Sequence, residues 1–564
     1  MIKQFIQHTL MFNFLFLLAF STAAQEEKID KQVQVVKAYQ PKMGNAYKIS
    51  ELPEIIDTTQ TDVRFDYYLL PKRIDTDFEV NPIPAASMVG EPLTELYGNY
   101  IKLGLGSKFS PEVELHLMNK RSKDRAYGAY FKHHSSGGKV TLGNGDRTYA
   151  GYSDNQLKLF GQKFFDNSVF STDAGIDRNT RYFYGYNTNI DTTFEKSDRE
   201  DIKQNFLRLN FSADYKTTHV DSAHLNYDID FDYNYLEDNF NTTENRFQLY
   251  GEFDKYYENN IIGLNTGFTS LKQNSSMDTV SNTLYKFNPW IGKFGDEWRI
   301  QGGVNFIAEV TNGNTKARFY PVARMEYNIV EHYVIPYAGV DGRIQLNSYQ
   351  DVTKNNPFIL PGLNVANTNY KMVFFAGLKG NLSSSTFYNV KLNYSFFDNM
   401  HFFTRNIMDT DSAANQFDVA YYEGEVMNLF GEISFDISEK LMLRAEGNIY
   451  QYAFYSEEQN GIETKPWHKP SFDLTLTGKY NLRNKILLQT DIYFSGKRWV
   501  RNIETQTARE LDGYVDVNLG IEYRYSKVLS GYLDFRNILA DNYNKWNNYP
   551  VYGLQAFLGI TYAF

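Results

Sequence analysis

The chain has 564 residues, no cysteine, and a formal net charge of −10, with 57 Lys and Arg against 67 Asp and Glu. The absence of cysteine excludes disulfides and thiolate metal sites, and the acidic balance excludes the basic footprint of a nucleic-acid-binding protein. Aromatic residues reach 16 %, with 44 Tyr and 43 Phe, although the mean hydropathy is −0.49. This mixture is typical of transmembrane β-barrels, in which lipid-facing apolar residues alternate with polar lumen residues and aromatic girdles mark both interfaces.

The first 24 residues have the pattern of a secretory signal peptide. Lys3 supplies a basic start, residues 11–20 an apolar core, and the small residues 21–24 a cleavage region. We expect cleavage near Ala24 or Gln25. No later apolar run approaches the roughly eighteen residues that a membrane-spanning helix needs. A membrane location therefore requires a closed barrel, because lipid offers no partner to an open strand edge.

Residues 25–96 differ from the rest of the chain because they show little sustained alternation of polarity and are rich in proline. Six of the fifteen prolines fall here, namely Pro41, Pro53, Pro71, Pro82, Pro84 and Pro92. Proline cannot donate to a sheet ladder and restricts the residue before it. We therefore expect an extended segment in the periplasm or inside the barrel mouth, as a partial plug. A disordered linker is the alternative.

From Tyr97 to Phe564, segments of alternating polarity follow one another. The clearest runs from Leu225 to Tyr235, with large apolar or aromatic residues at the odd positions and mostly aspartates at the even ones. Lipid outside and a wet lumen inside account for both faces. We expect an all-β, antiparallel transmembrane barrel of about 22 strands, within about 18–24. The residues predicted to line the lumen are Asp228, Asp230, Asp232, Arg318, Arg324, Glu326, Asp516 and Glu522.

The lengths of the connections support the same architecture. Both termini of such barrels lie in the periplasm, so short turns alternate with longer surface loops. Short connections are predicted near 165–168, 217–222, 258–260, 293–297, 330–332, 383–385, 437–440, 481–484 and 526–528. Longer ones are predicted near 186–203, 272–281, 348–368, 399–423, 457–469, 499–511 and 541–550, whereas 239–243 and 311–315 are short where a surface loop is expected.

The last segment has the pattern of a closing strand. Apolar or aromatic residues occupy the even positions from Leu554 to Phe564, opposite small or polar ones. We expect this strand to pair with the one that starts near Tyr97, so that the sheet has no edge. Phe564 and Tyr562 are the residues predicted to matter for barrel closure and assembly.

The strand count and the aromatic carboxyl terminus resemble the barrel of TonB-dependent receptors. The stretches Val35–Pro41, Lys48–Asp57, Val89–Leu93 and Tyr127–Ser136 are similar to a group of Bacteroidota outer-membrane proteins that carry this label. The resemblance implies a Gram-negative outer-membrane location with both termini in the periplasm. Receptors of this class carry a plug domain ahead of the barrel, and only about seventy proline-rich residues are available here. Energy-coupled transport is therefore an open question.

The run His133-His134-Ser135-Ser136 is the strongest candidate for catalysis. An outer-membrane phospholipase uses Ser and His on a barrel strand, with a third group that orients the imidazole. Adjacent residues of a strand point to opposite faces, so His133 and His134 cannot both serve one serine. We interpret the run as a polar junction between strand and loop. The sequence predicts no enzyme, no metal site and no cofactor.

Two further motifs have structural interpretations. The row Asp228, Asp230 and Asp232 lacks the glycine and the distal glutamate of a calcium loop, so it is interpreted as a solvated lumen wall. His116 shares the inward face with Glu112 and Glu114, and a structural hydrogen bond to a lumen carboxylate is expected.

Loops of a rigid scaffold often carry its function. The loop at 348–368 contains an apolar run from Pro357 to Pro361 that needs cover, which predicts a binding partner, a folded-in constriction or packing on neighbouring loops.

Two functions are compatible with these sequence features. The first is a transporter, channel or substrate receptor. The alternative is a non-transporting scaffold that anchors surface lipoproteins in a multi-protein complex. Expected partners are outer-membrane lipids, the barrel-assembly machinery during biogenesis, and a surface lipoprotein or periplasmic protein.

Overall fold

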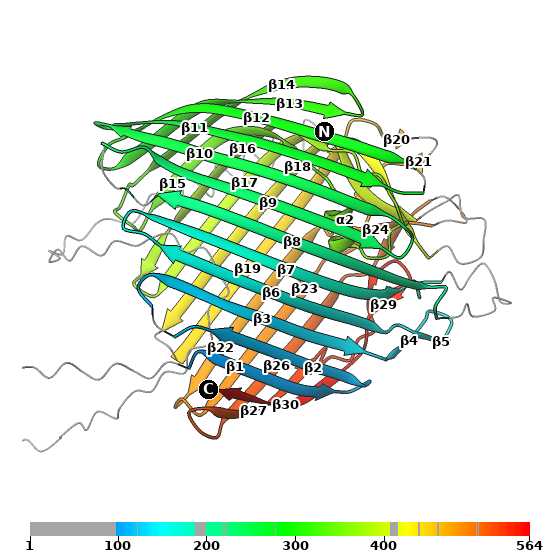
Figure 1. Cartoon of the computed structure of the whole chain (residues 1–564). Coiled ribbons are helices and arrows are strands. Elements are labelled where there is room, and N and C mark those ends of the chain that lie inside the picture. Colours follow the sequence, from blue (N-terminus) through cyan, green and yellow to red (C-terminus); the bar gives the residue numbers. More distant parts are fainter. Residues whose placement is uncertain are drawn as a thin grey trace, which may run out of the picture. The chain divides into compact units, whose positions relative to one another are not determined.

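The structure is a computed structural model that describes residues 97–120, 122–186, 199–217, 219, 223–276, 278–405, 415–437, 440–459, 462–502, 505 and 507–564. The expected signal peptide and proline-rich segment lie outside these residues. Within them, 22 antiparallel strands form one closed barrel, in which each strand pairs with its neighbours along the chain (Figure 1). The predicted fold class and strand number are confirmed.

The wall strands are β1 (Asn99–Gly106), β2 (Ser110–Met118), β3 (Arg125–Ser136), β6 (Tyr152–Phe164), β7 (Ser168–Tyr182), β8 (Lys203–Thr217), β9 (Asn226–Asp238), β10 (Thr243–Tyr257), β11 (Asn260–Asn274), β12 (Thr279–Phe294), β13 (Trp298–Thr311), β14 (Asn314–Tyr327), β15 (Ile335–Gln345), β16 (Thr368–Ser383), β17 (Thr386–Arg405), β18 (Phe417–Ile437), β19 (Leu441–Phe454), β22 (Phe472–Leu482), β23 (Ile486–Ser495), β26 (Tyr514–Arg524), β27 (Leu529–Arg536) and β30 (Gln555–Ala563). The connections hold the helix α2 (Tyr349–Asn355) and the short strands β4 (Lys139–Thr141), β5 (Arg147–Tyr149), β20 (Glu458–Gln459), β21 (Ile462–Glu463), β24 (Arg498–Arg501), β25 (Ala508–Leu511), β28 (Asn544–Trp546) and β29 (Tyr549–Pro550).

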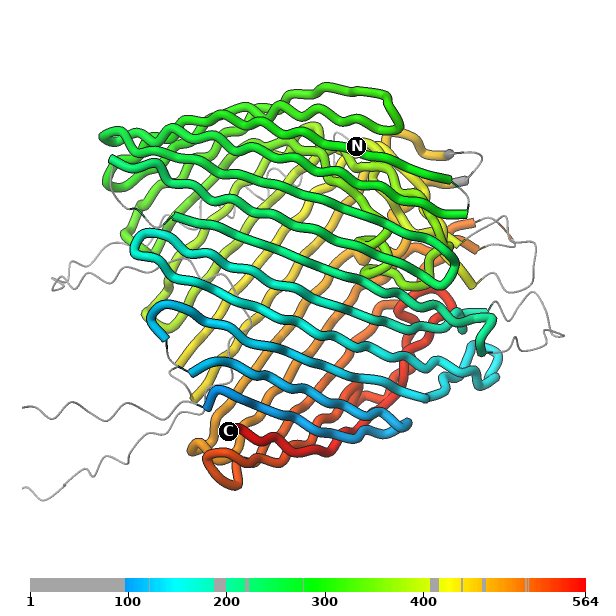
Figure 2. The backbone as a smooth tube through the Cα atoms, in the orientation of Figure 1, coloured from blue at the N-terminus to red at the C-terminus, as the bar shows by residue number. Residues whose placement is uncertain are grey.

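The first and last wall strands close the barrel. Figure 2 shows β1 and β30 side by side, and their register pairs Leu103 with Ile560 and Leu105 with Leu558. At the end of this ladder, Asn99 and Phe564 exchange two backbone hydrogen bonds, of 3.1 and 3.0 Å. The expected pairing of the carboxyl-terminal strand with the first strand is confirmed, and neither strand is left with an open edge.

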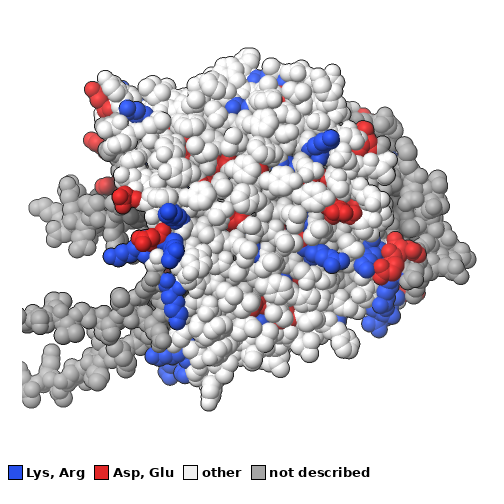
Figure 3. Space-filling model, viewed as in Figure 1, with Lys and Arg blue, Asp and Glu red and all other residues white. Residues whose placement is uncertain are grey.

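The side chains of a strand alternate between its two faces, and in the wall strands the apolar set of side chains points outward. Leu105, Phe319 and Leu558 are 63 %, 74 % and 64 % exposed, which places large apolar side chains on the outside. On the face shown in Figure 3, charged residues gather toward the two ends of the strands and few lie between them. This apolar belt is the surface that a barrel presents to lipid. None of the helices in the described residues is long and apolar enough to span a membrane.

The two ends of the barrel differ in the length of their connections. The end that holds Asn99 and Phe564, here called the turn end, has short connections such as 165–167, 258–259, 295–297 and 384–385. The opposite end, called the loop end, has the longer ones, including 137–151, 183–202, 346–367, 455–471, 496–513 and 537–554. The prediction of a longer loop at 272–281 is wrong, since β11 and β12 are joined by 275–278 alone. Their ladder extends to Asn274 and Thr279, which absorbs the remaining residues.

Candidate functional site

A buried apolar core lies at the loop end of the barrel. It unites residues that are far apart in the sequence, and we call it the loop-end cluster. Its members are Phe183, Ile202, Phe206, Leu236, Tyr349, Val352, Phe358, Ile359, Val365, Phe403, Phe417 and Tyr549. They come from three long connections and from the loop ends of β8, β9, β17 and β18. Because these strands belong to separated parts of the wall, the loops meet across the barrel mouth.

The helix α2 fastens the largest loop to the wall. Its first turn is capped by Ser348, whose side chain accepts from the backbone N–H of Asp351. The buried carboxylate of Glu244 on β10 accepts from the backbone N–H groups of Tyr349 and Gln350, at 2.7 and 3.2 Å. Arg246, two residues further on, pairs with Asp351 at 2.7 Å. Donors at a helix N-terminus favour a carboxylate partner, so this end of α2 is anchored inside the barrel.

The apolar run of this loop is covered. Phe358 is 8 % exposed and Ile359 is fully buried, and the Phe358 ring stacks on that of Tyr549 with centroids 3.9 Å apart. Of the three outcomes that the sequence left open, the loop is packed on its neighbours and folded inward. The run is therefore not an exposed surface for a partner.

Polar contacts join the other loops to the same region. The buried guanidinium of Arg405 donates to the carbonyl oxygens of Gly185 and Asn547, both at 2.9 Å. Asn415 donates to the carbonyl oxygen of Phe183 at 2.7 Å. These bonds link the connections 183–202 and 537–554 to Arg405 at the end of β17 and to Asn415 in the connection that follows it, and they satisfy backbone groups that would otherwise be buried without partners.

His468 is a buried titratable group of this assembly. Its Nδ1–H donates to the carbonyl oxygen of Phe403 at 2.8 Å, and its ring packs edge-on against Phe417. Burial, with smaller contributions from Arg498 and Arg405, lowers the pKa of His468 to about 3. The packed loops therefore hold the neutral imidazole.

Acidification should loosen the packed loops. An exposed histidine titrates near pH 6.5, so the stabilisation from His468 is complete above that pH and is lost as the pH falls toward the folded value of about 3. Between about pH 7.5 and about pH 5, we expect falling tryptophan fluorescence of the loop end. His468→Gln keeps a donor without titrating and should weaken the change. An equal acid transition in both proteins would contradict this role.

A second candidate site is a cavity of about 810 Å³ along the wall formed by β13 to β19. Its charged lining residues are six cations and two acids: Arg299, Arg324, Arg343, Lys379, Lys391, Lys469, Glu326 and Asp341. Lys379 pairs with Glu326 at 2.9 Å, and Arg343 approaches Asp341 at 3.9 Å. In the described part of the chain, the other four cations have no carboxylate partner. The cavity thus carries an uncompensated positive charge that favours anions.

The residues predicted to line the lumen alternate along their strands with exposed apolar or aromatic side chains such as Phe319 and Tyr523. Arg324 and Glu326 line the cavity itself. Arg318 pairs with Glu309 at 2.6 Å, and Asp516 accepts from the hydroxyl of Tyr543 at 2.6 Å. The ion pair offsets the charge of Arg318, whereas the hydrogen bond from Tyr543 leaves the charge of Asp516 in place. The role of the set in selecting solutes stays a prediction.

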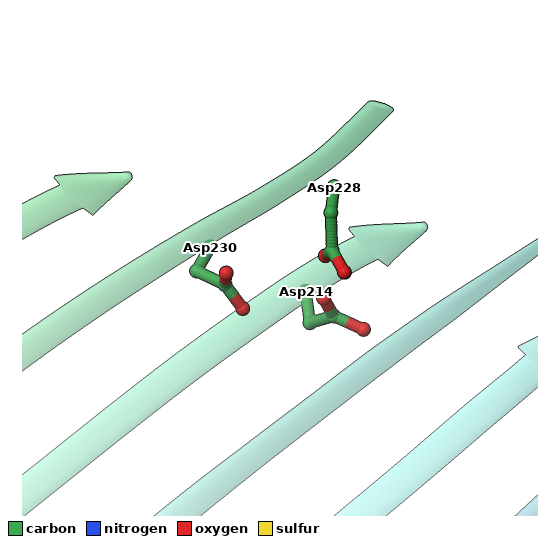
Figure 4. Close-up of side chains that lie close together, drawn as sticks. All are labelled: Asp214, Asp228 and Asp230. Carbon is green, nitrogen blue, oxygen red and sulfur yellow. The ribbon is translucent and has the colours of Figure 1, made fainter. Parts of the chain in front are cut away.

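The aspartate row of β9 is joined by an acid from the neighbouring strand that the sequence did not single out. Figure 4 shows the carboxylates of Asp214, Asp228 and Asp230 pointing toward one another, with ligand atoms within 4.8 Å. Asp214 stands directly opposite Asp230 in the β8–β9 register, which local patterning cannot predict. Lys216 forms an ion pair with Asp228. We interpret the group as part of the charged lumen wall.

Among the described residues, His116 does not make the expected hydrogen bond to a carboxylate. Its ring packs between those of Tyr100 and Tyr130, with centroids 5.7 and 4.5 Å apart. Glu114 instead pairs with Lys132 at 3.2 Å. The aromatic neighbours, two residues that sequence reasoning did not consider, occupy the space around the imidazole.

No protein-family model and no curated protein matches the chain. Several solved structures, in contrast, match the chain in fold. The FrpB iron transporter from Neisseria meningitidis (F3-3 variant) has a TM-score of 0.61 at 11 % identity, over 84 % of this chain and 82 % of that chain. The ferric-catecholate import receptor Fiu from Escherichia coli K12 has a TM-score of 0.60 at 9 % identity, over 84 % and 82 %. The pyoverdine outer membrane receptor FpvA from Pseudomonas aeruginosa PAO1 has a TM-score of 0.60 at 11 % identity, over 84 % and 79 %.

The chain has the barrel fold of TonB-dependent receptors. At this level of identity the likeness concerns the fold alone. The fold that the sequence resemblance implies is thus confirmed, and the neighbours are by their names transporters and receptors.

Proposed function

We propose that this protein is an outer-membrane transporter or receptor whose lumen binds an anionic solute. The observation that carries the proposal is the cavity between β13 and β19, where Arg299, Arg324, Lys391 and Lys469 have no carboxylate partner among the described residues. Cations that line a confined passage bias it toward anions. A barrel of the kind found in an iron transporter, a copper transporter and a pyoverdine receptor supports the transport part of the proposal.

The same proposal includes the orientation in the membrane. Short connections face the periplasm and long loops face outward in barrels of this type, so the turn end is assigned to the periplasm and the loop end to the cell surface. The segment 25–96 is assigned, as the sequence predicts, to the periplasm or to the barrel mouth. Cleavage after the signal peptide and insertion by the barrel-assembly machinery belong to the same scheme.

The scaffold alternative has lost one of the two features that favoured it; the short segment ahead of the barrel is the other. The apolar run Pro357–Pro361 was the surface expected to receive a surface lipoprotein, and Phe358 and Ile359 are buried within the loop-end cluster. Co-purification in mild detergent separates the two functions, because a stoichiometric partner bound at the loops is expected only for the scaffold.

Charge reversal in the cavity should reverse ion selectivity. With Arg324→Glu and Lys391→Glu combined, we expect the reversal potential in a potassium chloride gradient to move from anion preference toward cation preference. The measurement is a planar-bilayer recording of the purified barrel. Lys139→Glu combined with Lys255→Glu makes the same change in charge at exposed positions that do not line the cavity and should leave selectivity unaltered.

Two results would contradict the proposal. The first is a reversal potential that responds equally to the cavity pair and to the exposed pair. The second is a barrel that neither conducts nor binds inorganic phosphate or sulfate, measured by bilayer recording and by equilibrium dialysis.

A further inference from the structure

Polar residues interrupt the outward face of the wall on three adjacent strands. The last outward apolar residues toward the loop end are Phe131, Leu157 and Ile176, which the strand register aligns across β3, β6 and β7. The next outward positions are polar on all three strands: His133 and Ser135 on β3, Asn155 and Ser153 on β6, and Arg178 and Thr180 on β7. A change at one common level marks the boundary between lipid chains and headgroups, where ester groups lie.

Three of these side chains form a hydrogen-bonded relay. The hydroxyl of Ser135 donates to Nε2 of His133 at 3.2 Å. Nδ1–H of the same imidazole donates to Oδ1 of Asn155 at 2.7 Å. His133 and Ser135 are two residues apart on one strand and therefore share a face. Asn155 stands directly opposite His133 in the register.

The contacts of Asn155 determine which nitrogen of the imidazole carries the proton. Its amide nitrogen donates to Oγ of Ser153 at 3.1 Å and to the carbonyl oxygen of Arg178 at 3.4 Å. A carbonyl oxygen only accepts, so the amide nitrogen faces it and the amide oxygen faces His133. Nδ1 of His133 then holds the hydrogen, and Nε2 presents its lone pair to Ser135.

We propose that Ser135, His133 and Asn155 form a hydrolase site for the ester-linked acyl chains of membrane lipids, on the outer wall of the barrel. Such triads are defined by geometry and role, since the same arrangement recurs on unrelated folds. Ser135 is the nucleophile, His133 the general base and acid, and Asn155 the positioning residue. This activity is separate from solute passage through the lumen.

The reaction balances with water as the only co-reactant. Oγ of Ser135 attacks the ester carbonyl carbon and its proton passes to Nε2 of His133. The ester C–O bond breaks, and the imidazolium returns the proton to the leaving lysolipid alkoxide. Water, deprotonated by His133, then attacks the acyl-serine, which releases the fatty acid and restores Ser135.

Groups around the relay suit an ester at the headgroup level. Ser153 is directly opposite Ser135, and its Oγ accepts from Asn155, which leaves the hydroxyl hydrogen to donate to a developing oxyanion. Arg178 lies on the same face and is exposed, so its guanidinium can hold a lipid phosphate. The apolar belt below, including Leu157 at 39 % exposure, provides contact for the acyl chain.

The neighbours of the relay point the other way and serve as controls. Ser136 is 4 % exposed, and its hydroxyl donates to the carbonyl oxygen of Lys108 at 3.4 Å. His134 accepts a hydrogen bond from Tyr152 at 3.1 Å and lies 3.3 Å from the guanidinium of Arg536. Strand alternation places His133 and His134 on opposite faces, as the sequence predicts, but it places His133 and Ser135 on the same face.

The test uses the full barrel reconstituted in vesicles, with fatty-acid release measured by mass spectrometry. One set of vesicles contains phosphatidylethanolamine and phosphatidylglycerol, and the other contains lipid A as well, which identifies the lipid that supplies the ester. We expect Ser135→Ala to abolish release and His133→Ala to lower it by about 10²- to 10⁴-fold. Ser136→Ala should retain it. Asn155→Asp should restore most of the activity that Asn155→Ala loses.

A second readout does not depend on finding the right lipid. A fluorophosphonate should label Ser135, as mapped by peptide mass spectrometry, in the unaltered barrel and in Ser136→Ala, but not in His133→Ala. Folding of each variant is checked by heat-modifiable migration in gels. Absence of both labelling and release from correctly folded barrel would overturn the proposal, as would release that persists in Ser135→Ala.

Discussion

Replacing residues 349–364 with a short glycine and serine connection should turn the barrel into a permanently open pore. The removed segment contains α2 and the apolar run, and it contributes Tyr349, Val352, Phe358 and Ile359 to the loop-end cluster. Without them, the loop end loses the side chains that bridge its separated connections. In planar-bilayer recordings, we expect a larger change in single-channel conductance from this replacement than from the charge reversal in the cavity.

The design preserves the wall because Gln345 and Thr368 are directly paired at the end of the β15–β16 ladder. A connection of about four residues in place of 349–364 can join β15 to β16, because the paired ends of the two strands stay next to each other. The matched control removes residues 458–463, whose flanking Glu457 and Thr464 are linked by a backbone hydrogen bond of 2.9 Å. Conductance should remain at the original level in that control. If the loss of α2 also left the conductance unchanged, the loop-end cluster would not be what restricts passage through the barrel.

A valine at Gly559 should prevent efficient closure of the barrel. Gly559 pairs with Gly104 across the β1–β30 ladder. A Cβ atom at Gly559 would lie 2.3 Å from the carbonyl oxygen of Leu103 and 2.4 Å from the ring of Tyr532. The backbone oxygen cannot move without disturbing the ladder, and Lys102 packs over that tyrosine ring with 4.2 Å to its centroid. Overpacking of this kind costs about 1–3 kcal/mol.

The effect should be large because it falls on the pairing between the two wall strands that are furthest apart in the sequence. The strands β1 and β30 lie at opposite ends of the barrel sequence, so their ladder closes the longest loop and leaves two edges exposed until it is complete. We expect a strong decrease in the heat-modifiable, folded fraction in outer membranes. Gly302→Val is the control, since a Cβ there meets nothing within 4 Å.

Deletion of Phe564 tests the same ladder without overpacking. It removes both backbone hydrogen bonds between Phe564 and Asn99, together with the outermost aromatic side chain of the closing strand. The folded fraction should fall further than in any lumen substitution. Normal yield from both the deletion and Gly559→Val would contradict a decisive role for this seam.

Strand assignment succeeded because each strand carries its own two-residue period. Phe231 and Asp230 are adjacent, yet one faces lipid and the other the lumen, and this contrast is visible without knowing any neighbour. The positions of the short turns and of the closing strand follow from the same local signal. The error at 272–281 arose because polar residues also occur within ladders, where partners distant in sequence satisfy them: the side chain of Gln273 donates to the carbonyl oxygens of Gly362 and Leu363, and that of Asn274 to the hydroxyl of Thr243.

The sequence by itself determined the barrel, its strand number, its apolar exterior and the identity of the strand that closes it, because all of these depend on patterns within a few residues. Only the tertiary structure decided where the apolar run of the 346–367 loop is buried, since its cover comes from Tyr549 and Phe417, at distant points of the chain. The cationic cavity and the Ser135–His133–Asn155 relay were decided in the same way. Each requires the register between strands, and that register is determined by the pairing of whole ladders, which no single segment encodes.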